Sequence, residues 1–431
     1  MTLPDPAAIR AAVERRGDEI LEWTKEFIRF PSENRPPGGA EKGAQEFVRD
    51  ACEKEGWDTS TFTPDEAEGI RDHPSWLEGR DYGGGRKNVV AVWKGSDGRN
   101  GRSILFSGHT DVAPYEPDGW KECRPFEPVL KGNRLYGRGS CDMKGGIAAS
   151  FWGLKILAEL GWRPAGDIIF ETVVDEEFAG GNGTLASRLK GYNADLAVLT
   201  EPTRMEVCPA CLGAFLGDLV IMGKGGMPYM GSAIPNPIDG AARAIELFSA
   251  WEKEWRSENS HPLFEGADKK LNVVLWHVDS TTEGEFTQMG TPLLTKISWI
   301  TWCYPGMTEK RFFRSFGRFW DKHAAEDEVL KQFELKIVRT YHYVKAWESD
   351  SGSPAVKEVT EAFRHITGTR PSVGGAAFSC DLAIYGDAGG MPSVILGPRG
   401  DNLHAPDEWV LTDDILDLTG IYALLAASWC G

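Results

Sequence analysis

The sequence has no hydrophobic run long enough to cross a membrane. A spanning helix needs about 20 consecutive apolar residues, and the apolar runs in these 431 residues are all shorter. The first residues, Met1 to Asp5, also lack the basic region and apolar core of a secretory signal. We therefore expect a cytoplasmic protein without membrane contact.

Positive charge and clustered cysteines are both scarce. The chain has 64 acidic against 47 basic residues, a net charge of -17, and such a surface repels phosphate backbones. We expect no nucleic-acid partner. Eight cysteines without dense spacing predict reduced thiols. The single CxxC, Cys208 to Cys211, lacks the second pair of a typical structural zinc site and is interpreted as the end of a strand.

What the chain does have is an alternation of helix and strand patterns. Helical periodicity covers residues 6–30, 41–57 and 147–160, and short apolar runs typical of buried strands cover residues 89–93, 104–106 and 168–174. This alternation predicts an α/β fold. A hydrophobic content of 41% and the length of the chain are typical of a globular protein with two domains.

The pattern changes after residue 212. A strand pattern at 219–223, a helix at 238–255 and strands near Leu271 and Leu294 predict an inserted α+β domain of residues 213–345. The helix at 353–367 and a last strand at 392–397, before the loop of His404, return to the first domain. We therefore expect a mixed-sheet catalytic domain formed by residues 1–212 and 346–431.

Acidic and histidine side chains follow several of the predicted strands. Carboxylates and neutral imidazoles that converge from separate strand ends can hold two metal ions, which activate water for hydrolysis. Taken singly, each such residue is more often a capping or solvated group. Their coincidence at successive strand ends, where open α/β sheets bind ligands, favours a dinuclear metal site. The residues are His109, Asp142, Glu176, Glu177, Glu201 and His404.

Two of these signals have a more specific interpretation. On a strand, residues i and i+2 point the same way, so Asp111 can accept the second ring proton of His109. The adjacent Glu176 and Glu177 can divide into one base and one ligand.

Several stretches together make the chain resemble the co-catalytic metallohydrolase family that includes acetylornithine deacetylase, succinyl-diaminopimelate desuccinylase, aminoacylase and carboxypeptidase G. The resemblance extends over nearly the whole chain. The matching stretches are Ser107 to Val112, Gly137 to Gly146, Asp175 to Glu177, Thr200 to Thr203 and His404 to Glu408.

The resemblance implies a role for each residue. His109 and Glu201 would hold one divalent ion, Glu177 and His404 a second, and Asp142 would bridge them. Glu176 would be the general base, and a cis peptide bond would follow Asp142. The resemblance further implies a ferredoxin-like inserted domain that serves as lid and dimer interface, a homodimer or larger assembly, and one or two ions of zinc, manganese or cobalt.

The inserted domain departs from the family pattern. The family normally offers a histidine there to stabilise the oxyanion of an amide intermediate, but this chain has Met227, whose thioether donates no hydrogen bond. Trp302 replaces an arginine that often meets a substrate carboxylate, whereas Asn236 matches the family's lid asparagine. Core packing or neutral drift explains Met227 and Trp302 about as well as a role in substrate binding does.

These departures favour a small carboxylated aromatic amine as substrate, because charge flowing into a ring needs no oxyanion donor. The resemblance implies release of ammonia from 5-nitroanthranilate to give 5-nitrosalicylate. The alternative is a deacylase or dipeptidase acting on N-acyl amino acids. A third class, a non-catalytic binding protein of the same fold, would have no need of a base at Glu176.

Overall fold

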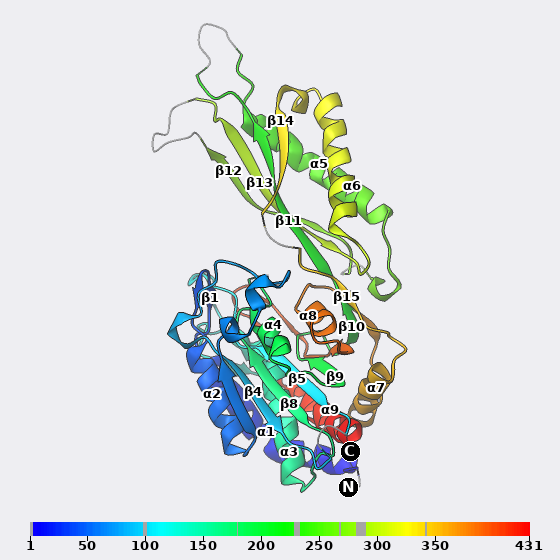
Figure 1. Ribbon diagram of the computed structural model, residues 1–431. Coiled ribbons are helices and arrows are strands. Elements are labelled where there is room, and N and C mark those ends of the chain that lie inside the picture. Colours follow the sequence, from blue (N-terminus) through cyan, green and yellow to red (C-terminus); the bar gives the residue numbers. More distant parts are fainter. Residues whose placement is uncertain are drawn as a thin grey trace. The chain divides into compact units, whose positions relative to one another are not determined.

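The computed structural model describes residues 3–97, 101–178, 180–227, 233–266, 269–281, 290–340 and 343–431. The chain divides into two compact units. Unit 1 contains residues 1–210, 348–376 and 380–431, and unit 2 contains residues 211–347 and 377–379. Figure 1 shows both units with the helices and strands labelled.

Unit 1 is built on a mixed nine-stranded sheet. Its order is β15-β10-β17-β9-β5-β8-β4-β3, and β16 pairs with β10. β5 runs parallel to β8 and β9, and β17 runs parallel to β9. The strands are β3 (Asp58–Phe62), β4 (Asn88–Trp93), β5 (Ile104–His109), β8 (Ile168–Val173), β9 (Leu196–Leu199), β10 (Val207–Cys211), β15 (Trp347–Glu348), β16 (Val373–Ala376) and β17 (Ser393–Ile395).

Helices cover this sheet, and its central strands are buried on both faces. Every residue of β5, β8 and β9 is buried, as expected for strands between two helical layers. α1, α3, α7 and α9 pack against one another, while α4 contacts α8 (Figure 1). The helices are α1 (Pro6–Ile28), α2 (Lys42–Lys54), α3 (Gly145–Glu159), α4 (Asn182–Leu189), α7 (Pro354–Thr367), α8 (Leu382–Asp387) and α9 (Thr412–Cys430).

Unit 1 also contains a smaller sheet with the order β18-β19-β7-β6. It joins β6 (Val129–Lys131) and β7 (Arg134–Tyr136) to β18 (Gly400–Asp401) and β19 (Trp409–Leu411). The expectation that residues 392–397 form the last strand before His404 is wrong, because the chain pairs once more in β18. The segments after β7 and around His404 are thereby brought side by side. A separate two-stranded ribbon joins β1 (Asn34–Arg35) to β2 (Gly38–Gly39).

Unit 2 has the ferredoxin-like arrangement predicted for the insertion. Four antiparallel strands lie in the order β12-β13-β11-β14, and the chain runs β11-α5-β12-β13-α6-β14. Phe316 of α6 packs on Trp299 of β13, and Trp251 of α5 packs on Phe316. The elements are β11 (Gly213–Met222), α5 (Pro237–Ser257), β12 (Val273–Thr281), β13 (Leu294–Cys303), α6 (Glu309–Glu326) and β14 (Glu334–Arg339).

The sequence predicts the absence of a membrane-spanning helix and of disulfide bonds, and the described residues bear on both predictions. Among these residues, no helix combines the length and apolarity that crossing a membrane requires. None of the eight cysteines, which all lie in the described ranges, forms a disulfide bond, and Cys208 and Cys211 lie in β10, the strand position expected for the CxxC.

Candidate metal centre

The predicted ligands lie at one edge of the large sheet. His109 is the last residue of β5, Glu176 and Glu177 follow β8, and Glu201 follows β9. Because these three strands are parallel neighbours, their carboxyl ends meet at the same edge, where open α/β sheets bind ligands.

Two connecting segments complete the group. Asp142 lies in the turn between β7 and α3, and His404 lies in the loop between β18 and β19. The peptide bond between Asp142 and Met143 is cis, as the resemblance implied.

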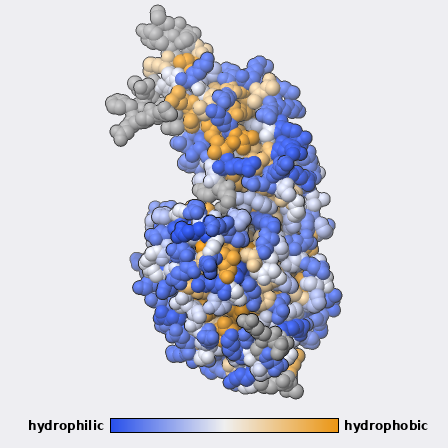
Figure 2. Space-filling view, in the orientation of Figure 1, coloured by the Kyte–Doolittle hydropathy of each residue, from blue (hydrophilic) through white to orange (hydrophobic). Residues whose placement is uncertain are grey.

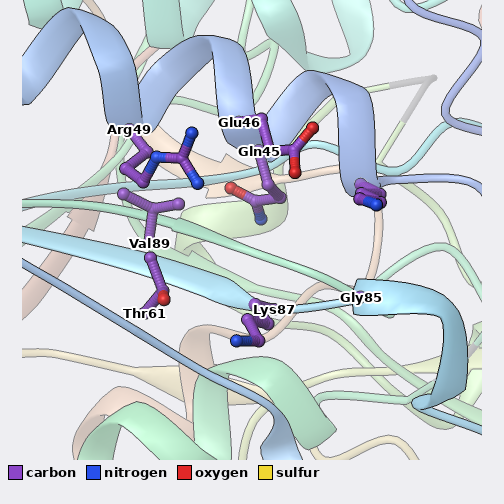
Figure 3. A pocket seen from close by; sticks show the side chains of 8 residues that line it. Gln45, Glu46, Arg49, Thr61, Gly85, Lys87 and Val89 are labelled. Atoms are coloured by element: carbon purple, nitrogen blue, oxygen red, sulfur yellow. The ribbon is translucent and has the colours of Figure 1, made fainter.

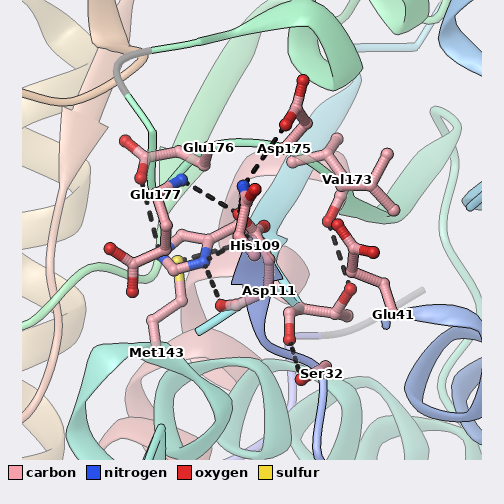
Figure 4. A network of polar contacts seen from close by, with 12 residues as sticks. Ser32, Glu41, His109, Asp111, Met143, Val173, Asp175, Glu176 and Glu177 are labelled. Atoms are coloured by element: carbon pink, nitrogen blue, oxygen red, sulfur yellow. Dashed lines mark hydrogen bonds and ion pairs between the residues drawn. The ribbon is translucent and has the colours of Figure 1, made fainter. Parts of the chain in front are cut away.

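The side chains converge as two groups that share Asp142. In each group the ligand atoms lie within 4.8 Å of one another. The first consists of His109, Asp142 and Glu201, and the second of Asp142, Glu177 and His404. Figure 4 shows His109 among the carboxylates that follow β8.

The two oxygens of Asp142 face different histidines. Nε2 of His109 is 3.2 Å from Oδ1 of Asp142 and 3.5 Å from Oε1 of Glu201. Nε2 of His404 is 3.3 Å from Oδ2 of Asp142 and 2.9 Å from Oε2 of Glu177. Asp142 therefore has one oxygen for each group, as a bridging ligand requires.

These separations fit metal ions. Two ligand atoms on one tetrahedral zinc ion, each about 2.0–2.1 Å from it, are about 3.3 Å apart, close to the spacing between the imidazoles and the carboxylates. The donor set of imidazole and carboxylate suits zinc, manganese and cobalt. The residues present thus fit two divalent ions, one on each side of Asp142.

The electrostatics of these side chains point to the same conclusion. Burial raises the pKa of Glu201 to about 7 and that of Glu176 well above its ordinary value. Glu177 raises the pKa of His404 to about 11. Burial opposes the charge on His109, but Glu201 and Asp142 outweigh it and raise its pKa. Negative carboxylates that are buried close together repel one another, so they keep their protons to a higher pH. Divalent cations would relieve that repulsion.

Glu176 is the carboxylate that belongs to neither group of ligands. Its Oε2 is 3.9 Å from Nε2 of His109, and its side chain is 16% exposed. It therefore borders the centre while keeping access to a substrate or a water molecule, as a general base requires.

Asp111 contacts His109, but differently from the expectation. The short contact of Nδ1 of His109, 2.8 Å, is to the backbone carbonyl of Asp111, and the carboxylate Oδ1 is 3.6 Å away. β5 ends at His109, so Asp111 is not on the same strand and the period of two does not apply. Instead, Oδ2 of Asp111 accepts from Asn34 and from the backbone N–H of Glu177.

Glu408 fixes the turn that carries Asp142. Its buried carboxylate accepts from Arg138 and from the backbone N–H groups of Gly139, Cys141 and Asp142. The sequence contained a signal for this residue, since Glu408 ends one of the stretches that resemble the family, but no role followed from it.

Asp381 is a further carboxylate that the sequence did not indicate. It lies just before α8 and accepts a 2.6 Å hydrogen bond from Thr184 of α4. Burial raises its pKa to about 7. Together with His109, Glu176 and Glu201 it lines a small cavity. No strand precedes Asp381 directly, so the search along strand ends could not find it.

The three residues of unit 2 expected to bind substrate are all described. Met227 follows β11 and is 58% exposed. Asn236 caps α5, where its side-chain oxygen accepts from the N–H of Ile238. Trp302 is half-buried on β13, opposite Ala214. Because Met227 is exposed, core packing does not explain why a methionine occupies this position. Contact with substrate stays a prediction for Met227, Asn236 and Trp302.

Comparison with known proteins decides the family. The model of peptidase family M20/M25/M40 matches residues 105–428, which include every predicted ligand. The chain belongs to this family. An N-formyl-4-amino-5-aminomethyl-2-methylpyrimidine deformylase of Bacillus subtilis is 26% identical over 98% of this chain and 97% of its own length. A succinyl-diaminopimelate desuccinylase of Methylobacterium radiotolerans is 29% identical over 75% of this chain and 80% of its own length.

Solved structures share the fold. The dipeptidase Dug1p of Saccharomyces cerevisiae superimposes with a TM-score of 0.71 at 13% identity, covering 99% of this chain and 98% of its own. The YXEP protein of Bacillus subtilis, described as a dinuclear metal binding peptidase, has a TM-score of 0.61 at 15% identity, with 97% and 99% covered. This M20 protein is a metal-dependent hydrolase that acts on C–N bonds.

The bridging position of Asp142 gives the first prediction. Asp142→Asn removes the charge shared by both groups, so metal retained after dialysis should fall from about two ions per chain to one or none. Elemental analysis by mass spectrometry measures the ratio. Asp118→Asn, at an exposed carboxylate, is the control and should retain both ions. Full retention by Asp142→Asn would contradict the bridge.

Proposed function

We propose that the protein hydrolyses a C–N bond of a small carboxylated substrate, with Glu176 as the general base. The observation that supports this assignment most is the position of Glu176, which lies 3.9 Å from His109 of the first ligand group and belongs to neither group. A protein that only bound a ligand would have no need of such a carboxylate.

The residues of the centre have different roles in hydrolysis. Divalent ions in the centre would supply a Lewis acid and lower the pKa of a coordinated water. Glu176 takes a proton from the attacking water and delivers it to the leaving nitrogen. The oxygen of water thus replaces nitrogen on carbon. The nitrogen leaves with one proton of the water, and the other proton stays on the new hydroxyl group. His109 is held in place through its Nδ1 hydrogen bond to the carbonyl of Asp111.

The finer proposal is that the substrate is an aromatic amine such as 5-nitroanthranilate, which would give 5-nitrosalicylate and ammonia. Met227 supports it, because the resemblance aligns this exposed thioether with the histidine that the family offers as an oxyanion donor. Loss of one such donor typically costs about 3 kcal/mol of barrier in amide hydrolysis. In an aromatic substitution the negative charge passes to a para nitro group, and no carbonyl oxyanion forms.

Amide hydrolysis is the second candidate. The deformylase and the desuccinylase among the relatives support it, and the deformylase matches nearly the whole chain. An N-acyl amino acid or a formamide would then be the substrate. The metal in use and the cytoplasmic location expected from the sequence stay predictions under both candidates.

We further propose that unit 2 joins two copies of the chain through β12. β12 is an edge strand, and its residues Val274, Trp276 and Val278 are 43%, 54% and 49% exposed. Figure 2 shows apolar side chains gathered over the strands of unit 2. An exposed apolar edge is a template for pairing with another strand, and a twofold axis would bring two β12 strands together.

The role of Glu176 gives the second prediction. Glu176→Gln keeps the shape of the side chain and removes its basicity, so kcat should fall at least about 100-fold, the usual contribution of general acid–base catalysis. Metal content should remain within the error of the wild-type value, because Glu176 is in neither ligand group. Unchanged turnover would remove Glu176 from the mechanism.

The identity of the bond that is cleaved gives the third prediction. Protein loaded with manganese or zinc should release ammonia from 5-nitroanthranilate and hydrolyse N-acetyl and N-formyl amino acids poorly. Met227→His should raise amide hydrolysis by about 100-fold or more, because it restores a donor. Absence of ammonia together with rapid amide hydrolysis by the wild-type protein would establish the second candidate instead.

The edge strand gives the fourth prediction. Light scattering should find a mass of about twice the 47.5 kDa of one chain. Trp276→Glu places a charge on the apolar edge and should give monomers, whereas Leu130→Glu, at an exposed apolar residue of unit 1, should not. A monomeric wild-type protein would exclude the interface.

A further inference from the structure

The connection between β3 and β4 is far longer than its position requires. These strands are antiparallel neighbours, and such pairs are usually joined by two to five residues, but here residues 63–87 intervene. Long ordered connections usually have a function of their own. This connection, which we call the β3–β4 loop, also lies outside the part of the chain that matches the family model.

The loop delivers three side chains to the carboxylate of Asp175. Arg80 donates from Nε at 2.8 Å and from Nη2, and Arg86 donates from Nη2 at 3.2 Å, all to Oδ1. Tyr82 donates to Oδ2 at 2.7 Å. Asp175 is fully buried, so these donors are what compensates for the loss of water around its charge.

Asp175 directly precedes Glu176 and Glu177. Its φ is +71°, a left-handed backbone conformation that residues other than glycine rarely adopt. This conformation sets the direction in which the chain leaves β8. Figure 4 shows Asp175, Glu176 and Glu177 in succession near Asp111 and His109. The donors that hold Asp175 therefore also fix where the next two carboxylates begin.

Asn34 ties the same group to the other side of the metal centre. Its Nδ2 donates to Oδ2 of Asp111 at 2.8 Å and to Oδ1 of Asp175 at 3.3 Å, and its Oδ1 accepts from Arg80. The same oxygen of Asp111 accepts from the backbone N–H of Glu177. The segment from Asp175 to Glu177 is thus held through a side chain at one end and a backbone N–H at the other.

The donors are themselves fixed. Arg86 makes a two-point ion pair with the buried carboxylate of Glu41, at 2.6 and 2.8 Å. The hydroxyl of Tyr82 accepts from Nδ2 of Asn182 at 2.7 Å, and Asn182 also bonds the backbone of Leu77. The side chains of Arg80 and Arg86 are only 3% and 2% exposed. Buried, paired guanidinium groups of this kind have a single geometry.

We propose that Arg80, Tyr82 and Arg86 of the β3–β4 loop are positioning residues for Glu176 and Glu177, and that they act through the carboxylate of Asp175. The assignment of Glu176 rests on the proposed function, whereas that of Glu177 rests only on its place in a ligand group. Loss of a donor lets the segment after β8 shift, which displaces the base and one metal ligand together.

The same loop supplies a matched control. Lys87 is adjacent to Arg86 but exposed, and it lines a cavity of about 250 Å³ with Lys42, Gln45 and Arg49 of α2. Figure 3 shows Lys87 at this cavity. Among the described residues no hydrogen bond or ion pair joins it to Asp175, so Lys87→Met changes the charge of the loop and leaves the donors in place.

The fifth prediction compares Arg80→Lys and Tyr82→Phe with Lys87→Met. Arg80→Lys keeps the charge and loses the fork of donors. Its kcat should fall about 10- to 100-fold with KM nearly unchanged, as a small displacement of catalytic groups does. Its affinity for Mn²⁺, titrated into metal-free protein and followed by electron paramagnetic resonance, should fall about 10-fold. Tyr82→Phe should change both quantities in the same direction by less, and Lys87→Met should change neither.

Two further results separate this role from general support of the fold. In an Asp175→Asn background, Arg80→Lys should cause little additional loss, because both changes break the same contact. Should Glu176→Gln retain turnover, the proposed base fails, and the loss of Mn²⁺ affinity in Arg80→Lys still decides the proposal. Wild-type kcat and metal affinity in folded Arg80→Lys would overturn it, as would equal losses in Lys87→Met. If Arg80→Lys does not fold, Tyr82→Phe decides in the same way.

Discussion

The carboxylate of Asp142, which both groups of candidate ligands share, is the constraint around which unit 1 is arranged. One of its oxygens faces His109 and the other faces His404, so three separate segments must meet at one carboxylate. β5 supplies the first histidine, the small sheet supplies the loop of the second, and the turn before α3 supplies Asp142. The parallel strands β5, β8 and β9 place the remaining ligands at the same edge.

Buried ion pairs keep those segments in place. Glu408 holds the turn of Asp142 through Arg138 and three backbone N–H groups. Asp175 holds the segment after β8 through two guanidinium groups and a tyrosine. Buried charges of this kind stabilise a fold little, because desolvation offsets their attraction. Their value here is geometric, since each fixes a turn that carries a proposed metal ligand.

Much of this arrangement could be predicted from the sequence because the signals are local. Acidic and histidine residues after apolar strands indicated the ligands, and a change in periodicity indicated the inserted domain. The contacts of Asn34, Arg80 and Asp381 could not be predicted, since they depend on residues distant in the chain that meet only in the fold. The sequence predicts that the carboxylate of Asp111 accepts the hydrogen bond from His109, whereas the backbone carbonyl of Asp111 does so. The reason for the difference is that β5 ends at His109, which the sequence does not reveal.

The central claim is that two divalent ions lie on either side of Asp142. The most direct measurement is anomalous X-ray diffraction from crystals of the protein soaked with manganese or zinc, recorded at the absorption edge of the metal. Two peaks should appear, one beside His109 and Glu201 and the other beside Glu177 and His404, each within about 2.3 Å of a different oxygen of Asp142. A single peak, or peaks that do not share Asp142, would contradict the account.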